Sequence, residues 1–128
     1  MPKWDAYKAE ARARGSLAFE LFVVQSTPEA PPETLKANLP DHLAYQQAME
    51  DAGHLVFAGP MSDETGEEMQ GMGMIVYRAK SFEEARALAE NDPMHKTGAR
   101  SYTLRKWMIN EGQLTVNVAL SAQAAKLI

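Results

Sequence analysis

The sequence has 128 residues, a formal net charge of -4 at pH 7 and no cysteine. This length fits a single domain that can bury a core of its own. The acidic balance argues against nucleic acid or an anionic membrane as a partner, because both require a basic patch. The lack of cysteine excludes disulfides, thiolate nucleophiles and thiolate metal sites. Residues 1–15 lack the apolar region of a secretory signal and no segment has the apolar length of a membrane span, so we expect a cytoplasmic protein.

The first half of the chain reads as helix, strand and helix. Residues 3–14 are rich in Ala, Lys, Glu and Arg, which predicts a helix. Residues 17–25 carry apolar side chains on both alternating faces, which predicts a strand covered on both sides. Residues 33–52 have a helical pattern, but Pro40 is unfavourable inside a helix. We therefore expect a short helical turn before Pro40 and then a new helix with this proline in its first turn.

The second half alternates between strand and helix patterns. Ser81 and Glu84 form a capping box, in which the serine caps the third helical amide and the glutamate reaches back, so a helix begins here. The expected elements are strands over residues 54–60, 71–79, 99–109 and 114–120, a helix from Ser81 to about Glu90, and a final helical turn over residues 122–127.

Without the two ends, the element order is β-α-β-β-α-β. This order predicts an α+β, ferredoxin-like fold with an antiparallel sheet and two helices on one face. We expect one domain over residues 1–128, with an N-terminal helical extension (1–15), a ferredoxin-like core (16–109) and a C-terminal extension (110–128). The other sheet face is largely apolar, which favours a homodimer that packs sheet against sheet. The fifth strand could cross to the partner and extend its sheet.

A helical wheel that starts at Leu35 places His42 near the middle of an apolar arc. The imidazole should therefore face the sheet rather than water. A histidine in this position is either a core residue held by a backbone carbonyl or one member of a functional pair.

Asp92 lies just past the end of a predicted helix, where the helix dipole disfavours a carboxylate. Pro93 forces the backbone of Asp92 into an extended conformation. The aspartate either bonds to its own backbone in a turn or gains a cationic partner. If the fold brings His42 and Asp92 together, they form an imidazole–carboxylate pair, a common means of moving protons near neutral pH.

Four motifs occur in a recognisable order between Phe19 and Trp107. They are His42-Leu43-Ala44-Tyr45, Gly53-His54-Leu55-Val56-Phe57-Ala58-Gly59-Pro60, Ser81-Phe82-Glu83-Glu84-Ala85 and Asn91-Asp92-Pro93. As a set they resemble the YciI-like (YCII) family. The resemblance implies a ferredoxin-like fold, assembly as a dimeric α/β barrel, and a catalytic pair that maps onto His42 and Asp92. Relatives in this fold group include lactone isomerases and dehalogenases that act on small acidic ring compounds. The basic residue that often precedes the histidine is absent here.

Further residues are candidates for substrate binding. His95, with Lys96 and Arg100, could supply positive charge to an anionic ligand, or could belong to a solvated loop. Gly59 and Pro60 could expose a backbone amide to a ligand, or could simply form a turn.

The sequence favours neither a metal nor a cofactor. A cluster of Met69, Met72 and Met74 could hold soft copper(I), but methionines more commonly fill gaps in a core. The three histidines lack the spacing of zinc ligands. No glycine-rich loop of the dinucleotide-binding or phosphate-binding type occurs.

Two functional hypotheses follow. The first is a small enzyme of the lyase, isomerase or hydrolase type, in which His42 and Asp92 perform acid–base chemistry on a small acidic or lactone-like substrate. The second is a dimeric protein that binds a small ligand without catalysis, in which the same pair is a structural contact.

Overall fold

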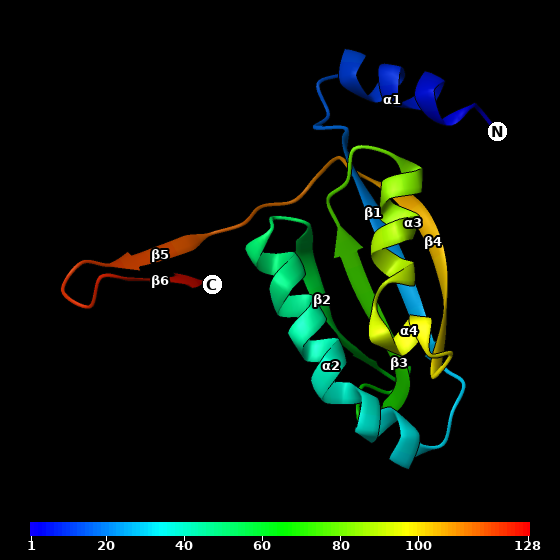
Figure 1. Ribbon diagram of the computed structural model, residues 1–128. Coiled ribbons are helices and arrows are strands. Elements are labelled where there is room, and N and C mark those ends of the chain that lie inside the picture. The colour runs from blue at the N-terminus through cyan, green and yellow to red at the C-terminus, as the bar shows by residue number, and fades with distance from the viewer. The chain divides into compact units, whose positions relative to one another are not determined.

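The computed structural model describes residues 1–128 and contains four helices and six strands (Figure 1). The elements are α1 (Trp4–Ala13), β1 (Phe19–Pro28), α2 (Pro32–Asp51), β2 (Leu55–Ser62), β3 (Met69–Tyr77), α3 (Phe82–Glu90), α4 (Pro93–Lys96), β4 (Arg100–Ile109), β5 (Val116–Ala119) and β6 (Ala124–Leu127). They form two compact units, one of residues 20–107 and the other of residues 1–19 with 108–128.

The larger unit contains a four-stranded sheet in the order β2-β3-β1-β4. Strand β3 pairs antiparallel with both β1 and β2. Helices α2, α3 and α4 all lie over the same face of this sheet (Figure 1). This arrangement confirms the predicted α+β, ferredoxin-like fold.

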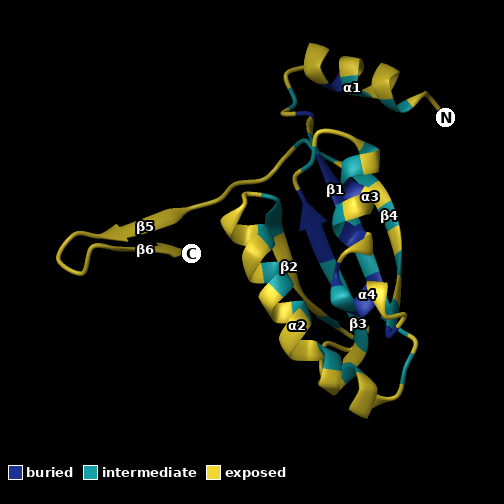
Figure 2. Cartoon of the chain, viewed as in Figure 1, coloured by how far each residue is buried: buried dark blue, intermediate teal, exposed yellow.

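The core of this unit lies between the two central strands and α3 (Figure 2). The β1–β3 register places Phe22 opposite Tyr77, and both side chains are buried. Small Ala85 and Ala89 on α3 are fully buried against them, which lets the helix approach the sheet closely. Burying a phenylalanine side chain of this kind contributes about 1.5–3 kcal/mol.

The opposite face of the sheet is partly apolar and partly exposed. Leu21 of β1 alternates with the core-facing Phe22 and is also buried, as the pattern of the strand predicted. Phe57 pairs with Val76 on this face, and 48% of its surface is exposed. Trp107 follows the outward-facing positions of β4 and is 43% exposed.

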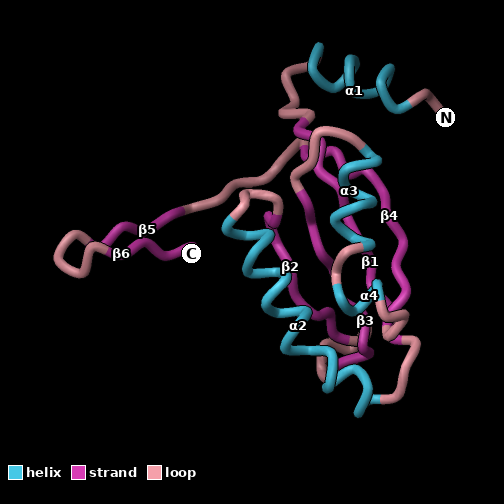
Figure 3. Tube along the Cα trace, viewed as in Figure 1, coloured by secondary structure: helices cyan, strands magenta, loops and turns pink.

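Helix α2 corrects the expectation of an interrupted segment around Pro40. The helix runs without a break from Pro32 to Asp51, with Pro40 inside it (Figure 3). Proline cannot donate a hydrogen bond to the carbonyl four residues earlier, here that of Lys36. Because Lys36 is exposed, water can satisfy this carbonyl, and the helix continues. None of the helices combines the length and the apolar character that a membrane span needs.

The smaller unit contains helix α1 and a hairpin of β5 and β6. The helix ends before Gly15, which has the positive φ of +89° typical of a residue that follows a helix. The predicted helical turn over residues 122–127 is wrong, because residues 124–127 form strand β6. Val116 pairs with Leu127 in an antiparallel register, so cross-strand pairing outweighs the helical preference of alanine and lysine.

Gly71 should be intolerant of a side chain. Its φ is +93°, and an added Cβ would lie 2.9 Å from Cγ of Pro28. We expect Gly71→Ala to lower the free energy of unfolding by about 1–3 kcal/mol, as measured by urea denaturation. Gly59→Ala is the matched control, because a Cβ there meets nothing within 4 Å. Equal stability of the two variants would contradict this assignment of strain.

Candidate active site

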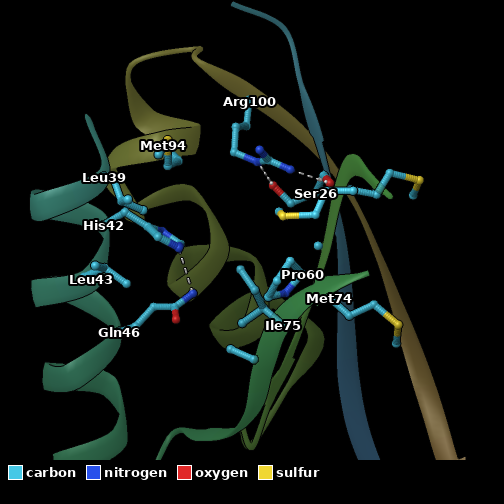
Figure 4. A pocket seen from close by; sticks show the side chains of 15 residues that line it. Ser26, Leu39, His42, Leu43, Gln46, Pro60, Met74, Ile75, Met94 and Arg100 are labelled. Carbon is cyan, nitrogen blue, oxygen red and sulfur yellow. Dashed lines mark hydrogen bonds between the residues drawn. The ribbon is translucent and has the colours of Figure 1, made fainter. Parts of the chain in front are cut away.

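A cavity of about 410 Å³ lies in the larger unit, between α2 and the strands (Figure 4). This volume falls within the range of pockets that bind small molecules. Most of the wall is apolar, and polar side chains reach it at Ser26, His42, Gln46 and Arg100. The complete lining is Ser26, Leu39, His42, Leu43, Gln46, Ala58, Gly59, Pro60, Met69, Met72, Gly73, Met74, Ile75, Met94 and Arg100.

His42 projects from α2 and connects this cavity to a buried carboxylate. Its Nδ1 atom lies 2.8 and 2.9 Å from the two carboxylate oxygens of Asp92. The His42 side chain is 18% exposed and that of Asp92 is fully buried. The structure therefore brings together the two residues that the sequence analysis paired.

Asp92 is positioned by the start of helix α4. It is the N-cap of this helix, with an extended backbone, and its side chain accepts a hydrogen bond of 3.0 Å from the Met94 amide. Pro93 occupies the first helical turn. The extended backbone of Asp92 was predicted from the sequence, whereas helix α4 was not, although aspartate followed by proline is a recognised start signal for a helix.

The contact between Asp92 and His42 defines which imidazole nitrogen carries a proton. A carboxylate only accepts hydrogen bonds, so Nδ1 of His42 is the donor. In the neutral imidazole, Nε2 then holds the lone pair. The side-chain amide of Gln46 lies 3.0 Å from Nε2 (Figure 4) and donates to it.

Two tyrosines beside Asp92 stay protonated. Burial, followed by the negative charge of Asp92, raises the pKa of Tyr45 to about 12. The same two causes, in the same order, raise the pKa of Tyr77. The Tyr45 hydroxyl donates to the Leu88 carbonyl at 2.6 Å, and the buried Tyr77 hydroxyl has no hydrogen-bond partner.

A second chain of polar contacts leads from Arg100 to His95. Arg100 Nε donates to Ser26 Oγ at 2.8 Å, and Ser26 Oγ lies 2.8 Å from His95 Nε2. His95 Nδ1 donates to the Ala89 carbonyl at 2.8 Å. The serine hydroxyl therefore accepts from the arginine and donates to the neutral imidazole. Burial lowers the pKa of His95.

The structure places the candidate residues in two groups. Four of them line the cavity, namely His42, Arg100, Gly59 and Pro60. The other two do not line it: Asp92 contacts the lining residue His42, and His95 contacts the lining residue Ser26. His95 is 8% exposed, so it does not belong to a solvated loop.

Several lining residues were not predicted to belong to a site, and the polar ones among them are Ser26 and Gln46. Gln46 follows His42 by one helical turn, and this spacing could have identified it. Ser26 carries a hydroxyl group near the end of a strand whose other buried side chains are apolar, which is a weaker indication of a site residue. The wall also includes Met69, Met72 and Met74.

The chain is thus an α+β protein with a histidine–aspartate pair beside a cavity of the size of a small molecule. Residues 18–108 match the YCII-related domain, so the chain belongs to the YCII-related family. Among solved structures, a 5-chloro-2-hydroxyhydroquinone dehydrochlorinase from Burkholderia phenoliruptrix, in complex with 2,5-dihydroxybenzoquinone, has the same fold. Its TM-score is 0.55 at 22% sequence identity, over 68% of this chain and 92% of that chain. No curated protein matches the sequence.

The burial of His95 should make the protein sensitive to acid. Its pKa in the folded state lies below the ordinary value of 6.5, so below that pH the unfolded chain binds a proton that the folded chain does not. The free energy of unfolding then falls as the pH decreases from 6.5 toward the lowered pKa. In urea denaturation between about pH 7.5 and about 5.5, we expect wild type to lose more stability than His95→Gln. Parallel losses in the two proteins would contradict a neutral buried His95.

Proposed function

We propose that this protein is a small enzyme that uses His42 and Asp92 for acid–base chemistry on a small acidic or lactone-like substrate. The observation that carries the proposal is the anchoring of His42. A fully buried carboxylate holds Nδ1, and the same imidazole lines a cavity of suitable size for a small molecule. Lyase, isomerase and hydrolase reactions can all use such a proton transfer.

The proposed reaction begins with a neutral His42. Its Nε2 lone pair accepts a proton from a substrate atom in the cavity, and the negative charge of Asp92 stabilises the resulting imidazolium. The Nε2–H group then returns the proton to another atom of the substrate. The Gln46 amide already donates to this lone pair, so the substrate must displace it before His42 can accept a proton. General acid–base catalysis of this kind contributes about 10²–10⁴-fold to a rate.

Membership of the YCII-related family and the enzymatic activity of the related structure support an enzyme. The alternative is a binding protein in which the pair is a structural contact. The Gln46 contact favours this alternative, because it already satisfies Nε2 of His42 within the chain.

His42→Gln should separate the two functions. A suitable assay follows turnover of a panel of small lactones, hydroxylated acids and 5-chloro-2-hydroxyhydroquinone by nuclear magnetic resonance. We expect wild type to convert at least one compound and His42→Gln to lose about 10²–10⁴-fold in rate. The melting temperature should change little, because the glutamine amide can still donate to Asp92.

His54→Gln is the matched control. His54 is partly exposed at 35% and contacts Glu84 at 3.8 Å, outside the cavity. This variant should retain the wild-type rate. A large fall in the melting temperature of His42→Gln with unchanged turnover would contradict the enzyme and favour the structural contact.

We further propose that the protein forms a homodimer through the helix-free face of its sheet. The exposed surfaces of Phe57 and Trp107 support this assembly, because large aromatic side chains on a sheet face are typical of interfaces.

Light scattering tests the dimer directly. The expected mass is twice the 14.1 kDa of one chain. Phe57→Glu should shift the protein toward the monomer, because a charge buried at an apolar interface is costly. A wild-type protein that remains monomeric at high concentration would contradict the dimer.

A further inference from the structure

Arg100 reaches the cavity without an acidic partner. It projects from the first position of β4 and lines the wall, and Figure 4 shows its guanidinium on the opposite side of the cavity from His42. The ion pairs of the larger unit involve other residues, namely His42 with Asp92, His54 with Glu84 and Lys106 with Glu20. The positive charge of Arg100 is therefore uncompensated by any carboxylate in contact with it.

The hydrogen bonds of Arg100 hold the guanidinium in one orientation. Nε donates to Ser26 Oγ at 2.8 Å and Nη2 donates to the Ser26 carbonyl at 2.9 Å. Nη2 also donates to the Gly71 carbonyl. These contacts use Nε and both hydrogens of Nη2, and leave the two hydrogens of Nη1 without an acceptor within the chain.

The environment makes an unpaired arginine costly. Burial lowers the pKa of Arg100, and the more distant charge of Asp92 acts in the opposite direction. Neutral hydrogen-bond acceptors satisfy part of the guanidinium but supply no negative charge. His95 contributes no charge of its own, because it is buried and donates and accepts as a neutral ring. A bound anion would supply the missing charge and accept from Nη1.

We propose that Arg100 is the receptor for an oxyanion, a carboxylate or an enolate, on a substrate that carries a single negative charge and an otherwise apolar body. We infer the apolar body of the substrate from the apolar side chains of Leu39, Leu43 and Ile75, which line the same cavity. This inference deepens the proposed function and rests on it, since it assigns the substrate class of the same site. The anion would accept a hydrogen bond from Arg100 inside the cavity that His42 also lines.

The free donors also predict how the anion is held. Because only Nη1 remains available, the contact is made from one nitrogen rather than from the two-nitrogen fork that usually binds a carboxylate. Recognition of the anion therefore depends on the positive charge of Arg100 and on its position, more than on the alignment of a planar guanidinium with a planar carboxylate. A lysine at this position should retain part of the affinity, whereas a neutral residue should not.

Calorimetry with benzoate and benzamide tests the proposal, because the two probes have similar shape and differ in charge. We expect wild type to bind benzoate at least about tenfold more tightly than benzamide. Arg100→Gln should reduce benzoate affinity by about tenfold or more and leave benzamide affinity unchanged, and Arg100→Lys should recover part of the loss. Glutamine retains an amide donor for the neighbouring carbonyls, and a circular dichroism melt of each variant checks folding.

Arg105→Gln is the matched control on the same strand. Arg105 is exposed and contacts Gln25 and Thr103, so its replacement should leave benzoate affinity unchanged. Equal binding of the two probes by wild type, or undiminished benzoate binding by Arg100→Gln, would overturn the anion receptor.

His42→Gln distinguishes this proposal from the proposed reaction. It should lose turnover while it still binds benzoate more tightly than benzamide, because Arg100 is unchanged. If His42→Gln retains turnover but Arg100→Gln loses benzoate affinity, the proposed acid–base function is wrong and the anion receptor is supported. If His42→Gln loses turnover but Arg100→Gln binds benzoate as wild type does, the receptor fails and the acid–base function stands.

Discussion

Asp92 has no exposed surface, and a carboxylate in such a place must be compensated by donors close to it. The compensation comes from two directions. The amide of Met94 contributes the N-terminal hydrogen bond of α4, and Nδ1 of His42 contributes the contact from α2. A segment of the chain fifty residues earlier is thereby tied to the loop after α3. The position and tautomer of His42 at the cavity follow from this one requirement.

Two groups of polar side chains border the cavity, and they differ in whether their charge can change during a reaction. On α2, His42 presents a nitrogen that can change its protonation state, with Asp92 behind it. On β4, Arg100 presents a fixed positive charge, oriented by Ser26. Between them the wall is largely apolar, which strengthens electrostatic interactions with a bound molecule. The YCII-related fold supplies the sheet and helices on which both groups are mounted.

Local patterns predicted the parts of the structure that depend on local forces. Alternation identified β1, the capping box identified the start of α3, and the helical arc placed His42 toward the sheet. The continuity of α2 through Pro40 depended on the exposure of Lys36, and strand β6 depended on its pairing with β5. The contacts of Ser26 with His95 and Arg100 join residues about seventy positions apart, and no local pattern encodes such contacts.

The position of the hydrogen on the His42 imidazole is the most direct test of whether Asp92 sets the tautomer of this ring. Nitrogen-15 magnetic resonance of the free protein reports which of the two nitrogens carries the hydrogen. We expect the hydrogen on Nδ1 in wild type, and we expect this preference to be lost in Asp92→Asn. A wild-type His42 with its hydrogen on Nε2, or a tautomer unaffected by Asp92→Asn, would contradict the role assigned to the pair.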